Sequence, residues 1–299
     1  ASHVYSRPMG RDTRDELRSG IEIAHAEVFN PYRFGVIGSS DGHNASSPVE
    51  EDTYHGKLPL MDGSAGIRMR QSLKMPEGMP GGERWSAAGL AAVWAPENTR
   101  GALFDAMRNK ETYATSGPRI TVRFFGGWDY PSDLLQQDEW IAAAYESGVP
   151  MGGELVGAQT GSPTFAIWAM RDPDSGNLDR IQVVKGWIDR QGQSREKVFN
   201  VAWSGERSLN ANGALPPVGN TVDAASASYS NTIGTDQLAV LWQDPEFTPG
   251  QEAFYYARVI EIPTPRWTTF DRKALGMEPP QRASLQERAV TSAIWYRPQ

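Results

Sequence analysis

Short segments in which apolar and polar residues alternate recur through the second half of the chain, and this feature restricts the fold most strongly. Turn-forming sequences such as Asp-Pro-Asp-Ser-Gly at residues 172–176 separate them. Several short strands with a period of two are typical of antiparallel sheets that bury one face. We therefore predict an antiparallel β-sandwich over residues 120–299. The alternating segments are 120–124, 164–168, 181–185, 198–203, 225–229, 237–242 and 254–262.

Composition excludes several classes of protein. The 299 residues carry a net charge of −7, which argues against nucleic acid as the main partner. The chain has no run of about 18 apolar residues, so we predict no membrane span. Cysteine is absent, which excludes thiol catalysis, thiolate metal sites and disulfides. Ten tryptophans are present, and four of them lie in strand patterns, where we favour core packing over a sugar-stacking platform. These four are Trp168, Trp187, Trp203 and Trp242.

The spacing of apolar residues predicts a helix over residues 11–29. Thr13 and Glu16 fit a capping box, with Thr13 as the N-cap. His25 lies beside the apolar stripe, and we interpret it as a packed or solvent-exposed residue rather than a ligand. The stripe consists of Leu17, Ile21, Ala24 and Val28.

An Asp-x-His pair follows a short apolar run. Phe34 to Ile37 predicts a buried strand, and Asp41 and His43 follow it two residues apart. Residues i and i+2 of an extended segment point the same way, so both side chains can reach one metal ion. The same triplet also fits an ordinary surface turn, and spacing alone does not decide between the two.

Residues 44–89 predict a long loop without periodicity, of the kind that serves as a lid or a partner-binding arm. Within it, an acidic stretch permits two interpretations, a second ligand cluster or a solvated loop, and we favour the solvated loop. Arg84 is a candidate contact for an anionic substrate, together with Lys57, Arg68 and Arg70. The acidic stretch contains Glu50, Glu51, Asp52 and His55.

A second strand and helix follow the loop. Residues 90–94 predict a strand, and Pro96 to Arg100 opens a helix whose inner face we assign to Leu103, Phe104 and Met107. The hydroxyl-rich turn that ends at Arg119 predicts a domain boundary there. We expect a rigid polar turn at residues 261–267.

Six segments stand out along the chain: Phe34–Asn44, Gly89–Trp94, Glu97–Arg100, Thr112–Arg119, Phe254–Thr269 and Ser292–Tyr296. Together these motifs resemble a bacterial family known as domain-of-unknown-function family 3604, which is related to the polymerase and histidinol phosphatase (PHP) phosphoesterases. The resemblance covers essentially the whole chain. It implies that residues 1–119 are the C-terminal part of a distorted α/β barrel of the PHP type, followed by the sandwich as an accessory domain. The sequence does not fix the compartment, and we favour a periplasmic or secreted location over a cytoplasmic one.

By this resemblance, Asp41 and His43 are the last Asp-x-His metal motif of a metal-dependent hydrolase, plausibly a phosphoesterase. Asp41 would bind or bridge metals, His43 would bind one of them, and the complete site would hold two or three Zn, Mn or Fe ions. Arg84 and Arg119 become candidate contacts for a small anionic substrate. The chain has four histidines and no His-x-His motif. We therefore expect an upstream segment or another chain to complete the barrel and this chain alone to be inactive.

A different class of function also fits the sequence. The sandwich would then be a non-catalytic module that binds a glycan or another protein. A His-x-His segment upstream in the same gene would favour the hydrolase. Quenching of tryptophan fluorescence by a sugar would favour the binding module.

Overall fold

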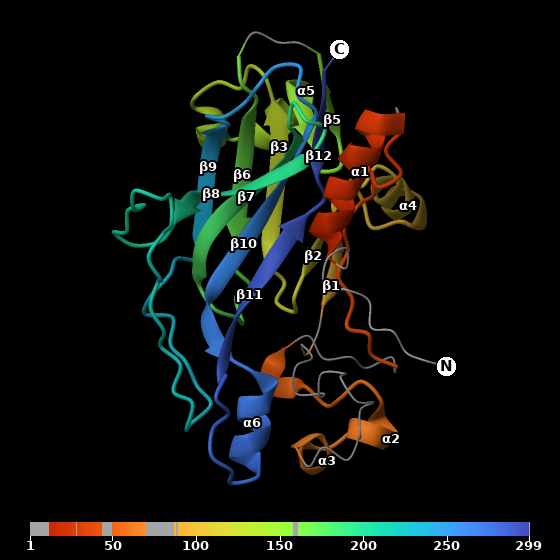
Figure 1. Ribbon diagram of the computed structural model, residues 1–299. Helices are drawn as coiled ribbons and strands as arrows, with labels where there is room; N and C mark the ends of the chain where they lie inside the picture. Colours follow the sequence, from red (N-terminus) through yellow and green to blue (C-terminus); the bar gives the residue numbers. More distant parts are fainter. Residues whose placement is uncertain are drawn as a thin grey trace.

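The computed structural model describes residues 12–27, 29–43, 50–69, 87, 89–157 and 161–298. Its centre is two β-sheets that pack face to face (Figure 1). The smaller sheet has the strand order β4-β3-β6-β9, all antiparallel. Its strands are β3 (Thr121–Gly127), β4 (Gly148–Pro150), β6 (Thr164–Met170) and β9 (Gln237–Gln243).

The larger sheet is organised on β10 (Ala253–Pro265), which pairs with β7 along one edge and with both β11 and β12 along the other. Every pair in it is antiparallel except β12 with β5. The other strands are β1 (Leu90–Val93), β2 (Thr112–Thr115), β5 (Glu154–Val156), β7 (Leu178–Ile188), β8 (Ser194–Trp203), β11 (Ser284–Thr291) and β12 (Ile294–Arg297).

The main hydrophobic core lies between the two sheets. Phe124 of β3 and Phe165 of β6 stack with ring centroids 5.6 Å apart, and Tyr255 of β10 packs on Phe165 at 4.5 Å. The alternation in the sequence has its cause here, because every second residue of these strands points into this layer. Trp187 and Trp242 are partly buried and pack against the same core.

Most predicted strands are confirmed, and two predictions are wrong. Residues 225–229 form only an isolated bridge between Asp223 and Ser228. Residues 261–267 are not a free polar turn, because β10 continues to Pro265 and α6 (Trp267–Ala274) begins directly after it. Within the described residues both sheets stay open, so the predicted barrel is not seen there. β1 and β2 instead join the larger sheet beside β11.

Helix α1 (Thr13–Glu27) confirms the first predicted helix and covers the outer face of the larger sheet (Figure 1). Leu17 and Ile21 are buried against a cluster that includes Phe254 and Trp295. The N-cap is Asp12 and not the predicted Thr13, because the Asp12 carbonyl accepts the first helical hydrogen bond from the Glu16 amide. His25 is exposed, which agrees with one of the two alternatives expected for it, a packed or a solvent-exposed side chain.

Two further predictions about elements need correction. Helix α4 (Arg100–Arg108) begins at the Thr99 cap, but Phe104 and Met107 are 56% and 53% exposed, and Ala106 is the residue that it buries. Residues 34–37 are extended without belonging to a strand, and Ile37 is 61% exposed. Two further short helices, η3 (Leu134–Gln136) and α5 (Trp140–Glu146), lie between β3 and β4 in the sequence.

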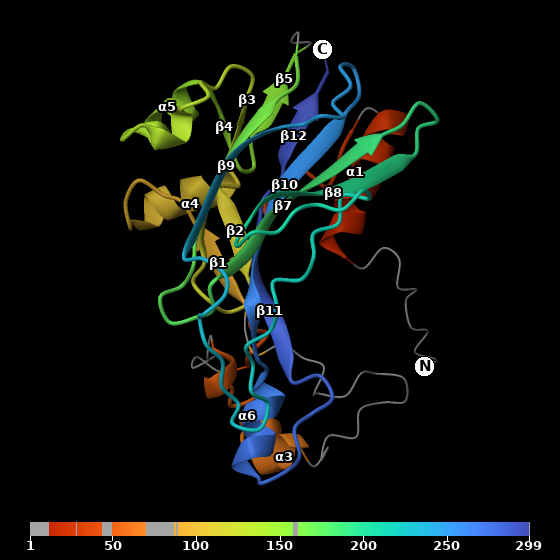
Figure 2. The same ribbon diagram turned by 90° about the vertical axis from the view of Figure 1, so that its left-hand side faces the viewer.

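The described part of the predicted long loop forms short helices beside α6 (Figure 2). Arg68 donates two hydrogen bonds of 2.7 Å to the Asp271 carboxylate and lies over the rings of Tyr54 and Trp267. This ion pair is buried, so residues 50–69 are tied to the far end of the larger sheet. The elements are η1 (Glu51–Thr53), α2 (Pro59–Asp62) and α3 (Ala65–Met69).

Candidate functional site

The turn that carries Asp41 and His43 is held against the start of β1. The Gly38 amide donates to the Leu90 carbonyl at 3.1 Å. A Cβ atom on Gly38 would lie 2.5 Å from that carbonyl oxygen, and one on Gly89 would lie 2.6 Å from the Ser39 carbonyl oxygen. Both positions therefore require glycine, because the two backbones approach too closely for any side chain.

Asp41 has a left-handed backbone, with φ at 54°. Aspartate tolerates this conformation better than most residues, and such turns are concentrated at functional positions. The Asp41 carboxylate lies 3.9 Å from the His43 Nε2 atom and 3.6 Å from the Lys57 ammonium. The Asp41 and His43 side chains are 78% and 59% exposed, so they converge on open solvent.

The metal hypothesis can be tested on this geometry. Two groups of the right chemistry, a carboxylate and an imidazole, converge at Asp41 and His43. Within the described ranges, no group of three or more acidic or histidine side chains is arranged to hold a metal ion. The two residues therefore fit as part of a ligand set, and the described residues do not complete it.

A second group of acidic residues lies at the junction between the larger sheet and residues 50–69. We call it the carboxylate group, and its core is Glu261 of β10 and Glu287 of β11, both buried. Ser175 donates to Glu261 at 2.7 Å, and Ser116 donates to Glu287. One oxygen of Glu261 has no hydrogen-bond partner among the described atoms. The other members are Glu50, Glu51 and Asp172.

Glu51 corrects the expectation of a solvated acidic loop. Its carboxylate is buried and accepts hydrogen bonds from the backbone amides of Ala87 at 3.1 Å and Trp267 at 2.5 Å. Glu50 is half-buried, whereas Asp52 is exposed. The acidic stretch therefore anchors residues 50–69 to the start of α6.

Burial raises the pKa of several members of the carboxylate group. Burial, with Asp172 nearby, raises the pKa of Glu50 to about 7. Burial, with Glu51 nearby, raises the pKa of Glu287 to about 8. Burial also raises the pKa of Glu261 well above its ordinary value, although the hydrogen bond from Ser175 opposes the shift. Low-dielectric surroundings and like charges both favour the neutral carboxyl form.

Sequence reasoning missed Glu261 and Glu287 as members of a buried cluster. A signal was present, because Glu261 follows the inward-facing Val259 by two residues and Glu287 precedes the inward-facing Ala289 by two. Strand periodicity alone would therefore have pointed both side chains inward. The prolines at positions 263 and 265 instead favour the polar turn expected over residues 261–267.

The two predicted substrate contacts have different outcomes. Arg119 has a largely exposed side chain whose guanidinium is 3.9 Å from Asp172, so it belongs beside the carboxylate group. Its backbone amide also donates to Asp172 at 2.7 Å. Arg84 lies outside the described residues. His55, named in the sequence with the acidic stretch, is half-buried, with its Nδ1 atom 3.3 Å from the Thr53 carbonyl oxygen.

Comparisons with known proteins place the chain in one family. No match was found among curated proteins, and none among solved structures. No helix in the described residues is long and apolar enough to cross a membrane. The family described as "Protein of unknown function (DUF3604)" matches residues 3–298. Because this match spans nearly the whole chain, the protein belongs to the DUF3604 family.

Proposed function

We propose that this chain is the C-terminal portion of a metal-dependent hydrolase related to the PHP phosphoesterases. The observation that carries the proposal is the convergence of Asp41 and His43 on one exposed turn, with 3.9 Å between the carboxylate and the imidazole. Membership of the DUF3604 family agrees with the motifs on which the resemblance rests. We also propose that the two-sheet region is an accessory domain and that the substrate is a small anion.

Asp41 and His43 supply two ligands, and a further segment or chain supplies the rest. Catalytic metal sites need three or more protein ligands, which exceeds what this turn provides. A divalent ion bound there would lower the pKa of a bound water and polarise a phosphoryl oxygen. Asp41 has a left-handed backbone, and the Lys57 ammonium lies 3.6 Å from its carboxylate.

Titration with Mn²⁺ or Zn²⁺, followed by calorimetry, tests the ligand assignment. The chain alone should bind a divalent ion weakly and show no phosphoesterase activity. Asp41→Ala and His43→Ala should each weaken binding about tenfold or more, because each removes one of two ligands. With the completing segment present, we expect two or three ions per molecule and a loss of both metal and turnover in either variant.

His25→Ala is the matched control, because it removes an exposed histidine that lies on α1. It should leave metal content and turnover unchanged. Full metal occupancy in the Asp41→Ala/His43→Ala double variant of the complete protein would disprove the assignment.

A further inference from the structure

A cavity of about 650 Å³ lies between the first turn of α1 and the outer face of the larger sheet. Its volume falls in the range of small-molecule sites. Arg14, Arg258 and Arg288 line it together with Tyr256 and Ile37. Asp41 and His43 do not line it, so it is separate from the turn described above.

The arginines reach the cavity because α1 covers only part of this face. Tyr256, at the edge of the apolar area under α1, accepts a hydrogen bond from the Arg14 Nε atom at 2.9 Å. Two residues further along β10, Arg258 lies on the same face. Arg258 is in register with Gln182 of β7, and Ile260 is in register with Arg288 of β11. The pleat therefore brings Arg258 and Arg288 to one surface.

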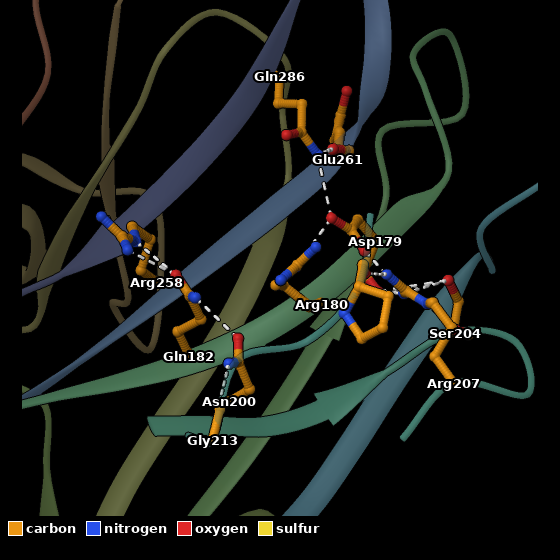
Figure 3. A network of polar contacts seen from close by, with 11 residues as sticks. Asp179, Arg180, Gln182, Asn200, Ser204, Arg207, Gly213, Arg258, Glu261 and Gln286 are labelled. Atoms are coloured by element: carbon orange, nitrogen blue, oxygen red, sulfur yellow. Dashed lines mark hydrogen bonds and ion pairs between the residues drawn. The ribbon is translucent and has the colours of Figure 1, made fainter. Parts of the chain in front are cut away.

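Neutral amides hold Arg258 in place (Figure 3). Its Nε and Nη2 atoms donate to the Gln182 side-chain oxygen at 2.9 and 2.6 Å. Gln182 donates in turn to Asn200 at 2.8 Å, and Asn200 donates to the Gly213 carbonyl at 3.2 Å. This chain of hydrogen bonds fixes the orientation of the guanidinium without neutralising its charge.

Two of the neighbouring arginines have carboxylate partners and two do not. Arg14 pairs with Glu196 at 3.2 Å, and Arg180 pairs with Asp179 at 2.9 Å (Figure 3). Among the described residues, Arg258 and Arg288 form no ion pair, and the one hydrogen bond of the Arg288 guanidinium goes to the Gln286 carbonyl, at 3.1 Å. Burial lowers the pKa of Arg258, and so do the charges of Arg14, Arg288 and Arg180. Arg258 is half-buried, and a positive charge that is partly removed from water is unfavourable unless an anion neutralises it.

We propose that this cavity binds a small organic anion whose phosphate or carboxylate group lies against Arg258 and Arg288. A guanidinium fork matches either oxyanion with paired hydrogen bonds. The opposite wall carries Asp12 and Asp15 at the start of α1, which favours hydroxyl or amino groups on the remainder of the ligand. Glycerol 3-phosphate and glycerate have this combination of groups and differ in the oxyanion.

Calorimetric titration with each of these two compounds tests the proposal and distinguishes the two sources of the oxyanion. Saturable binding of at least one is expected, with inorganic phosphate binding more weakly than glycerol 3-phosphate. Arg258→Gln and Arg288→Gln should each weaken binding about tenfold, the cost of one charge-assisted hydrogen bond. Arg288 is exposed, so its variant is expected to fold normally even where Arg258→Gln disturbs the amide chain.

Arg190→Gln is the control, because it removes an exposed arginine between β7 and β8 and changes the net charge equally. It should leave the affinity within about twofold of the unsubstituted protein. Absence of saturable binding of both compounds at about 10 mM would overturn the proposal. The same conclusion would follow if Arg190→Gln weakened binding as much as Arg288→Gln.

Discussion

Individual carboxyl groups give this protein its most unusual local chemistry. Glu287 is buried, and its pKa is raised to about 8, so most molecules carry a proton there at neutral pH. The Asp41–His43 pair was accessible to sequence reasoning, because two residues define it and the chain brings them together locally. Burial of Glu51 was not, since it depends on the start of α6 meeting residues 50–69.

The carboxylate group should make the free energy of unfolding fall as the pH rises. A carboxylate in a salt bridge would have the opposite effect. The folded protein binds the Glu287 proton more tightly than the unfolded chain does, because burial raises the pKa from 4.5 to about 8. The stabilisation that comes from binding this proton is therefore complete below about pH 4.5 and is lost as the pH rises toward 8. Urea denaturation between pH 5 and pH 8 should show a falling free energy of unfolding.

Glu287→Gln should remove part of this decline. At pH 8 the variant should be more stable than the unsubstituted protein by on the order of 1–3 kcal/mol, because no charge has to be buried. Glutamine can still accept the hydrogen bond from Ser116. Glu278→Gln, at an exposed position, is the control and should leave the pH profile unchanged. An identical profile for the Glu287 variant would contradict the assigned proton.

Some secondary-structure elements are specified by their own sequence, and others depend on contacts with residues far away in the chain. The existence of α1 and α4 was predictable because the signals that begin a helix lie in its own sequence, and at α4 the Thr99 side chain accepts from the Ala102 amide at 3.3 Å. Residues 34–38 were not, because their amides bond to the Ser292 hydroxyl and the Leu90 carbonyl instead of to a strand ladder. The exposed Phe104 and Met107 show that an apolar stripe does not specify which neighbour covers it.

Arg68 should control whether residues 50–69 stay attached to α6. Arg68→Ala removes a buried ion pair with Asp271 and the hydrogen bond to the Asp62 carbonyl at 3.0 Å. Loss of one partner leaves Asp271 buried and unpaired, which costs about 3 kcal/mol. Hydrogen exchange should therefore accelerate in residues 54–69, with little change in the strands.

The matched control is Arg195→Ala, which breaks a 2.7 Å pair with Asp189 whose arginine is 52% exposed. Surface pairs of this kind contribute about 0–1 kcal/mol, so exchange should stay close to that of the unsubstituted protein. Equal protection of residues 54–69 in the Arg68 and Arg195 variants would show that other contacts hold this segment.

At the scale of the whole molecule, one sheet joins the two halves of the sequence. β2 pairs with β11 through Ala289↔Thr115, Val290↔Ala114 and Thr291↔Tyr113. The boundary predicted at residue 119 falls between β2 and β3, and it stays a prediction. Period-two patterns identified most strands correctly, but they carry no information about pairing partners far apart in sequence. The placement of β1 and β2 beside β11 was therefore beyond sequence reasoning.

Tyr113 provides a test of whether the two predicted domains unfold together. Its side chain is 7% exposed and belongs to the same core as Val122 of β3 and Val259 of β10. Tyr113→Ala should therefore lower the free energy of unfolding by about 3–4 kcal/mol and shift one cooperative transition in calorimetry. Phe104→Ala, at a 56% exposed position, should change the same transition by less than about 0.5 kcal/mol.

Two independent domains would instead give two transitions, and Tyr113→Ala would shift only one of them. That result would support the boundary at Arg119, since the strand pairing between β2 and β11 would then be too weak to couple the halves.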